Sequence, residues 1–132
     1  MNDALGILRI IGDYCHAVDE RAGDGLAQLF TVDSELDFMG EHIRGRAAIV
    51  DRLSTTTAAG LVHVPYNPIL EINGDTAHGT VDHLLLRRGQ DGTFAIAVVG
   101  RWIDEYTKDQ GDWTIARRRI HTPYGPPVDS GS

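Results

Sequence analysis

Apolar residues recur every three or four positions in the first part of the chain, which is the period of an amphipathic helix. The pattern predicts a helix that Asn2 or Asp3 can cap and that ends at Gly23, with apolar positions at Leu5, Leu8, Ile11, Cys15 and Val18. Asp24 can cap a short second helix, "GLAQLF". "SELDFM" (34–39) alternates as a strand with "GEH" as its turn, and a third helix, "RAAIVDRLS", follows Gly45.

The second half of the chain changes to the alternation of strands. Tight-turn signals, led by Asn73-Gly74, separate four strands predicted over 61–72, 76–88, 93–108 and 113–121. Helices followed by strands indicate an α+β fold. A long antiparallel meander must curve, and helices on its concave face would leave a pocket, which is a common kind of ligand site.

Composition narrows the possible functions. The chain has 132 residues and a net charge of −7, which suits one domain, predicted over 1–121, and excludes a nucleic-acid partner that needs a basic face. No apolar run reaches the length of a membrane span and no signal peptide is evident, so we expect a cytoplasmic protein with no membrane partner. The Pro-, Gly- and Ser-rich segment 122–132 is predicted to be a flexible tail.

Metal and cofactor sites have no signature in the sequence. Cys15 is the single cysteine, and the six histidines lack metal-ligand spacing. Phosphate-loop, dinucleotide-binding and nucleophile-elbow motifs are also missing. We therefore expect neither a metal nor an organic cofactor.

A few polar residues stand where the pattern predicts apolar ones. Asp19 continues the apolar series of the first helix, near an end where the helix dipole disfavours negative charge. His83 lies between Val81 and Leu85 on one strand face, where a buried histidine needs a partner. A solvent-facing Asp19, a structural or exposed His63 and a satisfied core His83 remain alternative readings.

Strand alternation sorts residues into faces without choosing between them. Ile96, Val98, Gly100 and Trp102 share one face of the third long strand, and Ala116, Arg118 and Ile120 share one face of the fourth. Arg118 alone reads as part of a solvated basic strip. Both faces are apolar in the middle strands, which predicts that a second copy covers the outer face in a dimer or trimer.

Several segments resemble the SnoaL-like branch of the NTF2-like superfamily. They are "YCHAVDER", "DGLAQLFTVD", "IRGRAAI", "HVPYNPILEINGDTA", "VGRWIDEY" and "GDWTIARRRI". The resemblance covers about residues 3 to 121 and implies an NTF2-like/cystatin-like cone, in which helices pack on a strongly curved, mainly antiparallel sheet around a pocket.

Within that branch, the chain resembles scytalone dehydratase and hexachlorocyclohexane dehydrochlorinase. The resemblance implies a catalytic dyad of Asp19 and His63, with His83 as a second pocket histidine. Trp102 replaces the dehydratase's pocket asparagine, and Tyr14 replaces the dehydrochlorinase's lysine and could donate a hydrogen bond. The implied pocket walls are Val81, Leu85, Ile96, Val98, Trp102 and Arg118, with Leu29, Phe30, Phe38 and Tyr66 as further candidates.

The resemblance thus implies a cofactor-free lyase of the dehydratase type, or an isomerase, that acts on a small hydrophobic and cyclic substrate. The alternative is a non-catalytic ligand-binding or assembly domain of the same fold. Epoxide opening ranks lower, because its Asp/Arg/Asp arrangement would need Asp82, which lies on the strand face opposite His83.

Overall fold

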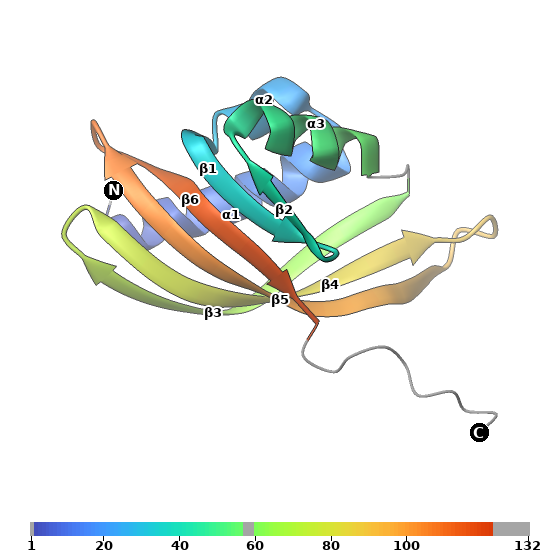
Figure 1. Cartoon of the computed structure of the whole chain (residues 1–132). Helices are drawn as coiled ribbons and strands as arrows, with labels where there is room; N and C mark the ends of the chain where they lie inside the picture. The colour runs from blue at the N-terminus through green and yellow to red at the C-terminus, as the bar shows by residue number, and fades with distance from the viewer. Residues whose placement is uncertain (1, 57–59, 123–132) are drawn as a thin grey trace.

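The computed structural model of the chain describes residues 2–56 and 60–122, so most of the predicted tail lies outside the described residues (Figure 1). These residues form three helices and six strands, with the helices in the first half of the chain and the four longest strands in the second. They are α1 (Asp3–Asp19), α2 (Gly23–Ala27), β1 (Phe30–Phe38), β2 (Glu41–Arg44), α3 (Arg46–Thr56), β3 (Leu61–Asn73), β4 (Thr76–Arg88), β5 (Phe94–Asp109) and β6 (Asp112–His121).

The strands form one curved sheet in the order β2-β1-β6-β5-β4-β3. All neighbours pair antiparallel except β1 and β6, which run parallel. Helix α1 crosses the concave side of the sheet, and α2 and α3 lie with the β1–β2 hairpin above it (Figure 1). The predicted α+β class and helix-on-curved-sheet architecture are confirmed, and the sheet is open rather than closed.

Helix α1 buries a face that is rotated from the predicted one. Its side-chain cap is Asn2, whose oxygen accepts a hydrogen bond from the backbone N–H of Leu5 at 2.8 Å. Leu5 and Leu8 are exposed, because the packed stripe follows Ile7, Ile11 and Tyr14 at helical spacing. The buried residues are Ile7, Ile10, Ile11, Tyr14, Cys15, Ala17 and Val18.

The segment after α1 differs from the prediction. Helix α2 starts at Gly23 and its N-cap position is Ala22, so Asp24 lies in the first turn and is not the cap. Phe30, predicted to be helical, is instead the first residue of β1, because it pairs with Ile115 of β6. The β1–β2 turn is Met39-Gly40, one position earlier than predicted, and both residues have positive φ angles.

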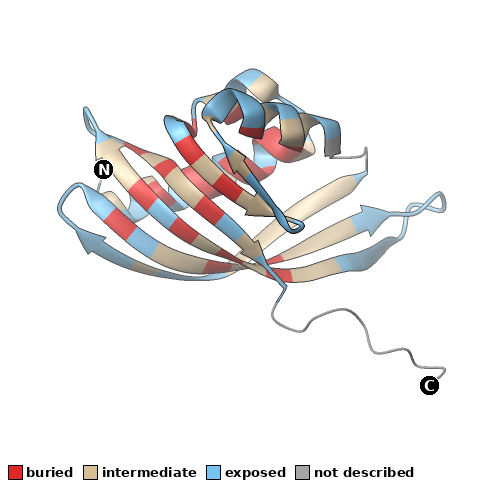
Figure 2. Ribbon diagram, in the orientation of Figure 1, coloured by how far each residue is buried: buried red, intermediate tan, exposed pale blue. Residues whose placement is uncertain are grey.

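Two β-bulges change which side chains face inward. Leu85 pairs with Val98 but Leu86 pairs with Ile96, so Ala97 is an extra residue on β5. A second bulge, at Ala116 of β6, lets both Ile115 and Arg118 point inward. Figure 2 shows buried positions alternating along the strands, whereas the tip of the β4–β5 hairpin is exposed.

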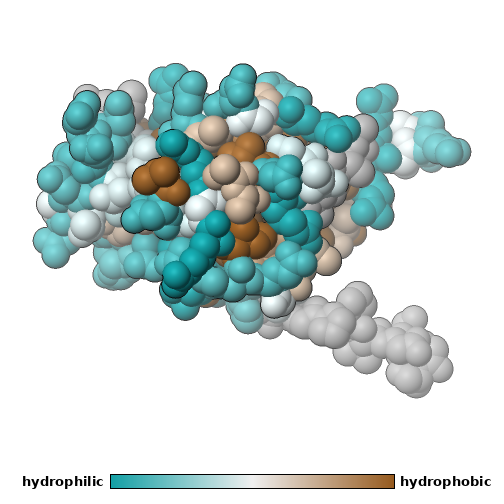
Figure 3. Space-filling view, turned by 45° about the horizontal axis from the view of Figure 1, so that its top comes forward, coloured by the Kyte–Doolittle hydropathy of each residue, from teal (hydrophilic) through white to brown (hydrophobic). Residues whose placement is uncertain are grey.

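The outer face of the sheet remains partly apolar. Val64, Leu84 and Val99 are cross-strand neighbours there and are half-buried. Covering of this face by another copy of the chain stays a prediction. The face turned to the viewer in Figure 3 is mostly hydrophilic, with hydrophobic side chains gathered near its centre. Among the described residues, no helix has the length and apolar content needed to cross a membrane.

Candidate active site

The end of α1 and the start of β3 bring Asp19 and His63 together. Oδ1 of Asp19 lies 2.6 Å from Nδ1 of His63, and the Asp19 carboxylate also accepts the backbone N–H of His63 at 3.1 Å. Because a carboxylate accepts and does not donate, the contact favours the tautomer of a neutral His63 ring in which Nδ1 carries the proton and Nε2 the lone pair. The two side chains are 19% and 13% exposed, respectively, so the pair is shielded but not closed off.

His63 opens onto a cavity of about 560 Å³ between α1, the sheet and the β1–β2 hairpin, a size suited to a small organic ligand. Its walls are mostly apolar and its polar groups are few. The lining residues are Tyr14, Val18, Phe38, Met39, Gly40, Leu53, Leu61, His63, His83, Leu85, Arg87, Val98, Trp102, Ile120 and Thr122.

The second histidine of the cavity, His83, lies flat against Trp102. The two rings are stacked with centroids 4.8 Å apart, and Gly100 on the neighbouring strand leaves room for the imidazole. Burial, with smaller effects of His63 and Arg118, lowers the pKa of His83 to about 4, so its ring is neutral near pH 7. Nδ1 of His83 has no hydrogen-bond partner among the described residues.

A buried ion pair stands behind the cavity wall. Arg118 donates two hydrogen bonds of 2.8 Å to Asp104, which also accepts the hydroxyl of Tyr106 at 2.5 Å. The guanidinium carbon lies 4.3 Å from the ring centroid of Tyr14 and 4.0 Å from that of Trp102. Burial opposes the charge of Arg118, but the Asp104 carboxylate outweighs it and raises the pKa of the guanidinium.

Tyr14 joins the two pairs. Its ring meets the imidazole of His63 edge-on, with centroids 6.3 Å apart, and the Arg118 guanidinium lies over the same ring. Burial raises the pKa of Tyr14, although Arg118 opposes this shift. The hydroxyl therefore stays protonated at neutral pH and can donate a hydrogen bond.

The structure brings most of the sequence-predicted site residues to one cavity. They are Tyr14, Phe38, His63, His83, Leu85, Val98 and Trp102, with Asp19 behind His63. Two others, Arg118 and Val81, are fully buried behind the wall instead of lining the cavity, and Arg118 is no solvated strip residue. Leu29 and Phe30 belong to the hydrophobic core.

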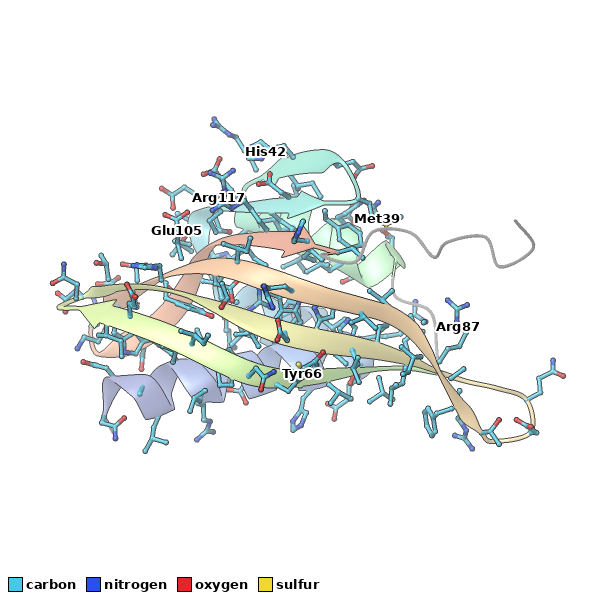
Figure 4. The ribbon with its side chains drawn as sticks, turned by 90° about the horizontal axis from the view of Figure 1, so that it is seen from below. Met39, His42, Tyr66, Arg87, Glu105 and Arg117 are labelled. Carbon is cyan, nitrogen blue, oxygen red and sulfur yellow. The ribbon has the colours of Figure 1, made fainter. Side chains whose placement is uncertain are left out.

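Two predicted wall residues lie outside the cavity. The bulge at Ala97 moves Ile96 out of step with Val98, and its side chain is 62% exposed. Tyr66 pairs with Asp82 on the outer face, because inward positions on β3 alternate with it. Figure 4, seen from below, shows Tyr66 away from Met39 at the cavity.

Sequence reasoning missed several lining residues. Strand alternation could have predicted Arg87, because it lies on the same face of its strand as His83 and Leu85. Met39 and Gly40 carry no such signal, since the fold of the β1–β2 hairpin brings their turn to the cavity. Within the described part of the chain, no group of three or more His, Cys, Asp or Glu side chains is placed to hold a metal.

Comparisons with known proteins agree with this fold. The SnoaL-like domain model matches residues 1–119. No curated protein sequence matches the chain. Solved relatives have the NTF2-like, cystatin-like fold.

Three solved structures illustrate the similarity. Rv3472 from Mycobacterium tuberculosis, a protein of unknown function, is 27% identical with a TM-score of 0.85, over 97% of this chain and 74% of that one. A scytalone dehydratase-like protein from Novosphingobium aromaticivorans DSM 12444 is 25% identical with a TM-score of 0.80, over 91% and 83%. A hexachlorocyclohexane dehydrochlorinase, LinA type 2, shares the fold at 20% identity and a TM-score of 0.80, over 96% and 89%.

Proposed function

The chain belongs to the SnoaL-like family, and we propose that it is a cofactor-free lyase of the dehydratase type, or an isomerase, with an Asp19–His63 general-base dyad. One observation carries the proposal: the 2.6 Å contact between Asp19 and Nδ1 of a histidine that lines an apolar cavity. This contact leaves Nε2 as the basic atom, and the carboxylate can stabilise the imidazolium that forms.

Elimination of water can proceed on this one base. Nε2 of His63 takes the proton from a carbon beside the one that bears the hydroxyl, and the C–H electron pair forms the double bond as the C–O bond breaks. The proton then passes from the imidazolium to the departing hydroxide, which leaves as water from the same face. Return of the proton to a different carbon would give isomerisation with the same groups.

His83 and Tyr14 are suited to stabilise the leaving oxygen. Since the pKa of His83 is about 4, its ring is neutral at pH 7 and acts as a hydrogen-bond donor rather than as a proton source. The Tyr14 hydroxyl is likewise a neutral donor. Donors placed where negative charge develops stabilise the transition state.

The substrate proposed for this site is a small hydrophobic ring compound. Leu61, Leu85 and Val98 offer aliphatic surface between the histidines and the open end of the cavity, and Trp102 offers an aromatic face. A volume near 560 Å³ accommodates one or two rings with substituents.

A substrate screen followed by variants of the dyad tests the proposal. Hydroxylated cyclic ketones and acids would be screened for loss of water or for exchange of carbon-bound hydrogen in D₂O. On any substrate found, we expect His63→Ala and Asp19→Asn to lower kcat by about 10²- to 10⁴-fold while the protein stays folded.

Matched variants control for the loss of a histidine or a charge. His78→Ala removes an exposed histidine on β4, and Asp13→Asn removes an exposed carboxylate on α1; both should turn over like wild type. A folded His63→Ala variant with the wild-type rate would remove the dyad from the mechanism. Binding without turnover in wild type would favour the ligand-binding alternative.

A further inference from the structure

Arg87 is the one arginine or lysine among the described residues that line the cavity. It lies on β4, two residues beyond Leu85 and four beyond His83, so all three project from the same face. Figure 4 shows the Arg87 side chain toward the end of the sheet where Met39 also lies. The cavity thus has its histidines inside and a guanidinium at its open end.

No described residue neutralises this guanidinium. Arg87 makes no side-chain hydrogen bond or ion pair within residues 2–56 and 60–122, whereas Arg101, Arg117 and Arg118 pair with carboxylates. The chain has 19 acidic and 12 basic side chains, so carboxylates for pairing are plentiful. An unpaired arginine at a cavity mouth is therefore available to a ligand.

The spacing along the strands defines where an anion would sit. His63 pairs with Leu85, and Arg87 pairs with Leu61, so Arg87 lies one same-face step beyond the dyad. Such a step is about 7 Å along a strand. A ligand that reaches both ends would present its reacting carbon to His63, an apolar ring to Leu61 and Leu85, and an anionic group to Arg87.

We propose that Arg87 binds a carboxylate of the substrate, and that the substrate class is a cyclic or aromatic carboxylic acid. This inference rests on the proposed function for the choice of reacting end. The planar guanidinium matches a carboxylate with two parallel hydrogen bonds. Because Arg87 is exposed, water and salt weaken the contact, and we expect it to contribute about tenfold in affinity.

The test compares 2-naphthoate with its uncharged amide, 2-naphthamide, by isothermal titration calorimetry at low salt. The wild-type protein should bind the carboxylate about tenfold more tightly than the amide. Arg87→Gln should remove this preference and leave amide binding within about twofold. Arg87→Lys keeps the positive charge but loses the two parallel N–H donors of the guanidinium, so it should give an intermediate preference for the carboxylate.

Arg88→Gln is the matched control. It removes the same charge one residue further on, and Arg88 is not among the residues that line the cavity. It should leave the preference unchanged. Equal affinities of wild type for the two probes, including no binding of either, would overturn the proposal, and so would an equal loss in Arg88→Gln.

The outcome is separable from that of the dyad. The protein could show a carboxylate preference that depends on Arg87 but turn over no substrate. That result would support the role of Arg87 and contradict the proposed catalysis. If instead turnover depends on His63 and the protein shows no carboxylate preference, the proposed catalysis is supported and the role of Arg87 is contradicted.

Discussion

Tyr14 contacts one member of each of two carboxylate–base pairs, and these pairs differ in access to solvent. The Asp104 and Arg118 side chains are 0% exposed, whereas Asp19 and His63 are 19% and 13% exposed. In the closed pair, Arg118 is held by Asp104 and by two aromatic rings. In the open pair, the Asp19 carboxylate contacts Nδ1 of His63 and leaves Nε2 for a ligand. Access to the cavity, rather than the type of pair, distinguishes the structural role of the closed pair from the catalytic role that we propose for the open one.

Removing each carboxylate's charge should give the largest difference between the two pairs. Asp104→Asn leaves the Arg118 charge buried and uncompensated, which we expect to lower the free energy of unfolding by about 3–5 kcal/mol. Asp19→Asn keeps an oxygen that accepts the backbone N–H of His63, and should cost about 1 kcal/mol. Urea denaturation followed by tryptophan fluorescence measures both.

The same two variants can also contradict the assignment of a structural role to the Asp104–Arg118 pair alone. Equal losses would mean that the open pair is as structural as the closed one. A small loss for Asp104→Asn would mean that the two rings and the remaining amide suffice to hold Arg118.

His83 lies between the two pairs, and its protonation sharpens the contrast. Its pKa is about 4 in the folded protein against an ordinary value of 6.5, because burial and the neighbouring His63 and Arg118 disfavour its charge. As pH falls from about 6.5 to 4, the unfolded chain therefore takes up a proton that the folded chain does not, and stability falls by up to about 3 kcal/mol.

The measurement is urea denaturation of wild type and His83→Gln at several pH values. The difference between their unfolding free energies should change across this window and level off below pH 4. A constant difference would show that His83 titrates alike in both states. The carboxylate of Asp37, whose pKa is lowered by His42 and Arg117, acts at lower pH and is common to both proteins.

Local patterns predicted the helices and the long strands because the spacing of apolar residues differs between a helix and a strand. They did not predict the parallel pairing of β1 with β6, because Phe30 and its partner Ile115 lie far apart in the sequence. For the site, the resemblance supplied Asp19 and His63 as partners, and the structure brings them together. Helical spacing alone had made Asp19 only an oddity.

The errors at the site have different causes, and one of them is a β-bulge. Strand alternation assigns faces correctly until a bulge inserts a residue, and both β5 and β6 contain one. Ile96 was therefore assigned to the cavity but lies outside it. Arg118 was assigned the inner face correctly, but alternation gives no depth, so its burial behind Tyr14 and Trp102 could not be inferred.

Gly100 offers the smallest and most local test of how the wall between the two pairs is built. A Cβ at this position would lie 2.5 Å from Cε1 of His83 and 3.1 Å from the carbonyl oxygen of His121, so Gly100→Ala should cost about 1–3 kcal/mol. Gly12→Ala on α1 is the control: a Cβ there meets nothing within 4 Å, and alanine favours the helix.

A double-mutant cycle then identifies the source of the cost. If the clash with the imidazole dominates, His83→Ala should recover part of the loss in Gly100→Ala, giving a coupling energy above about 0.5 kcal/mol. No coupling would assign the cost to the His121 backbone instead. If Gly100→Ala were as stable as wild type, the His83 ring could move away from Trp102 at no cost in stability. The stacking on Trp102 would then not fix the position of His83.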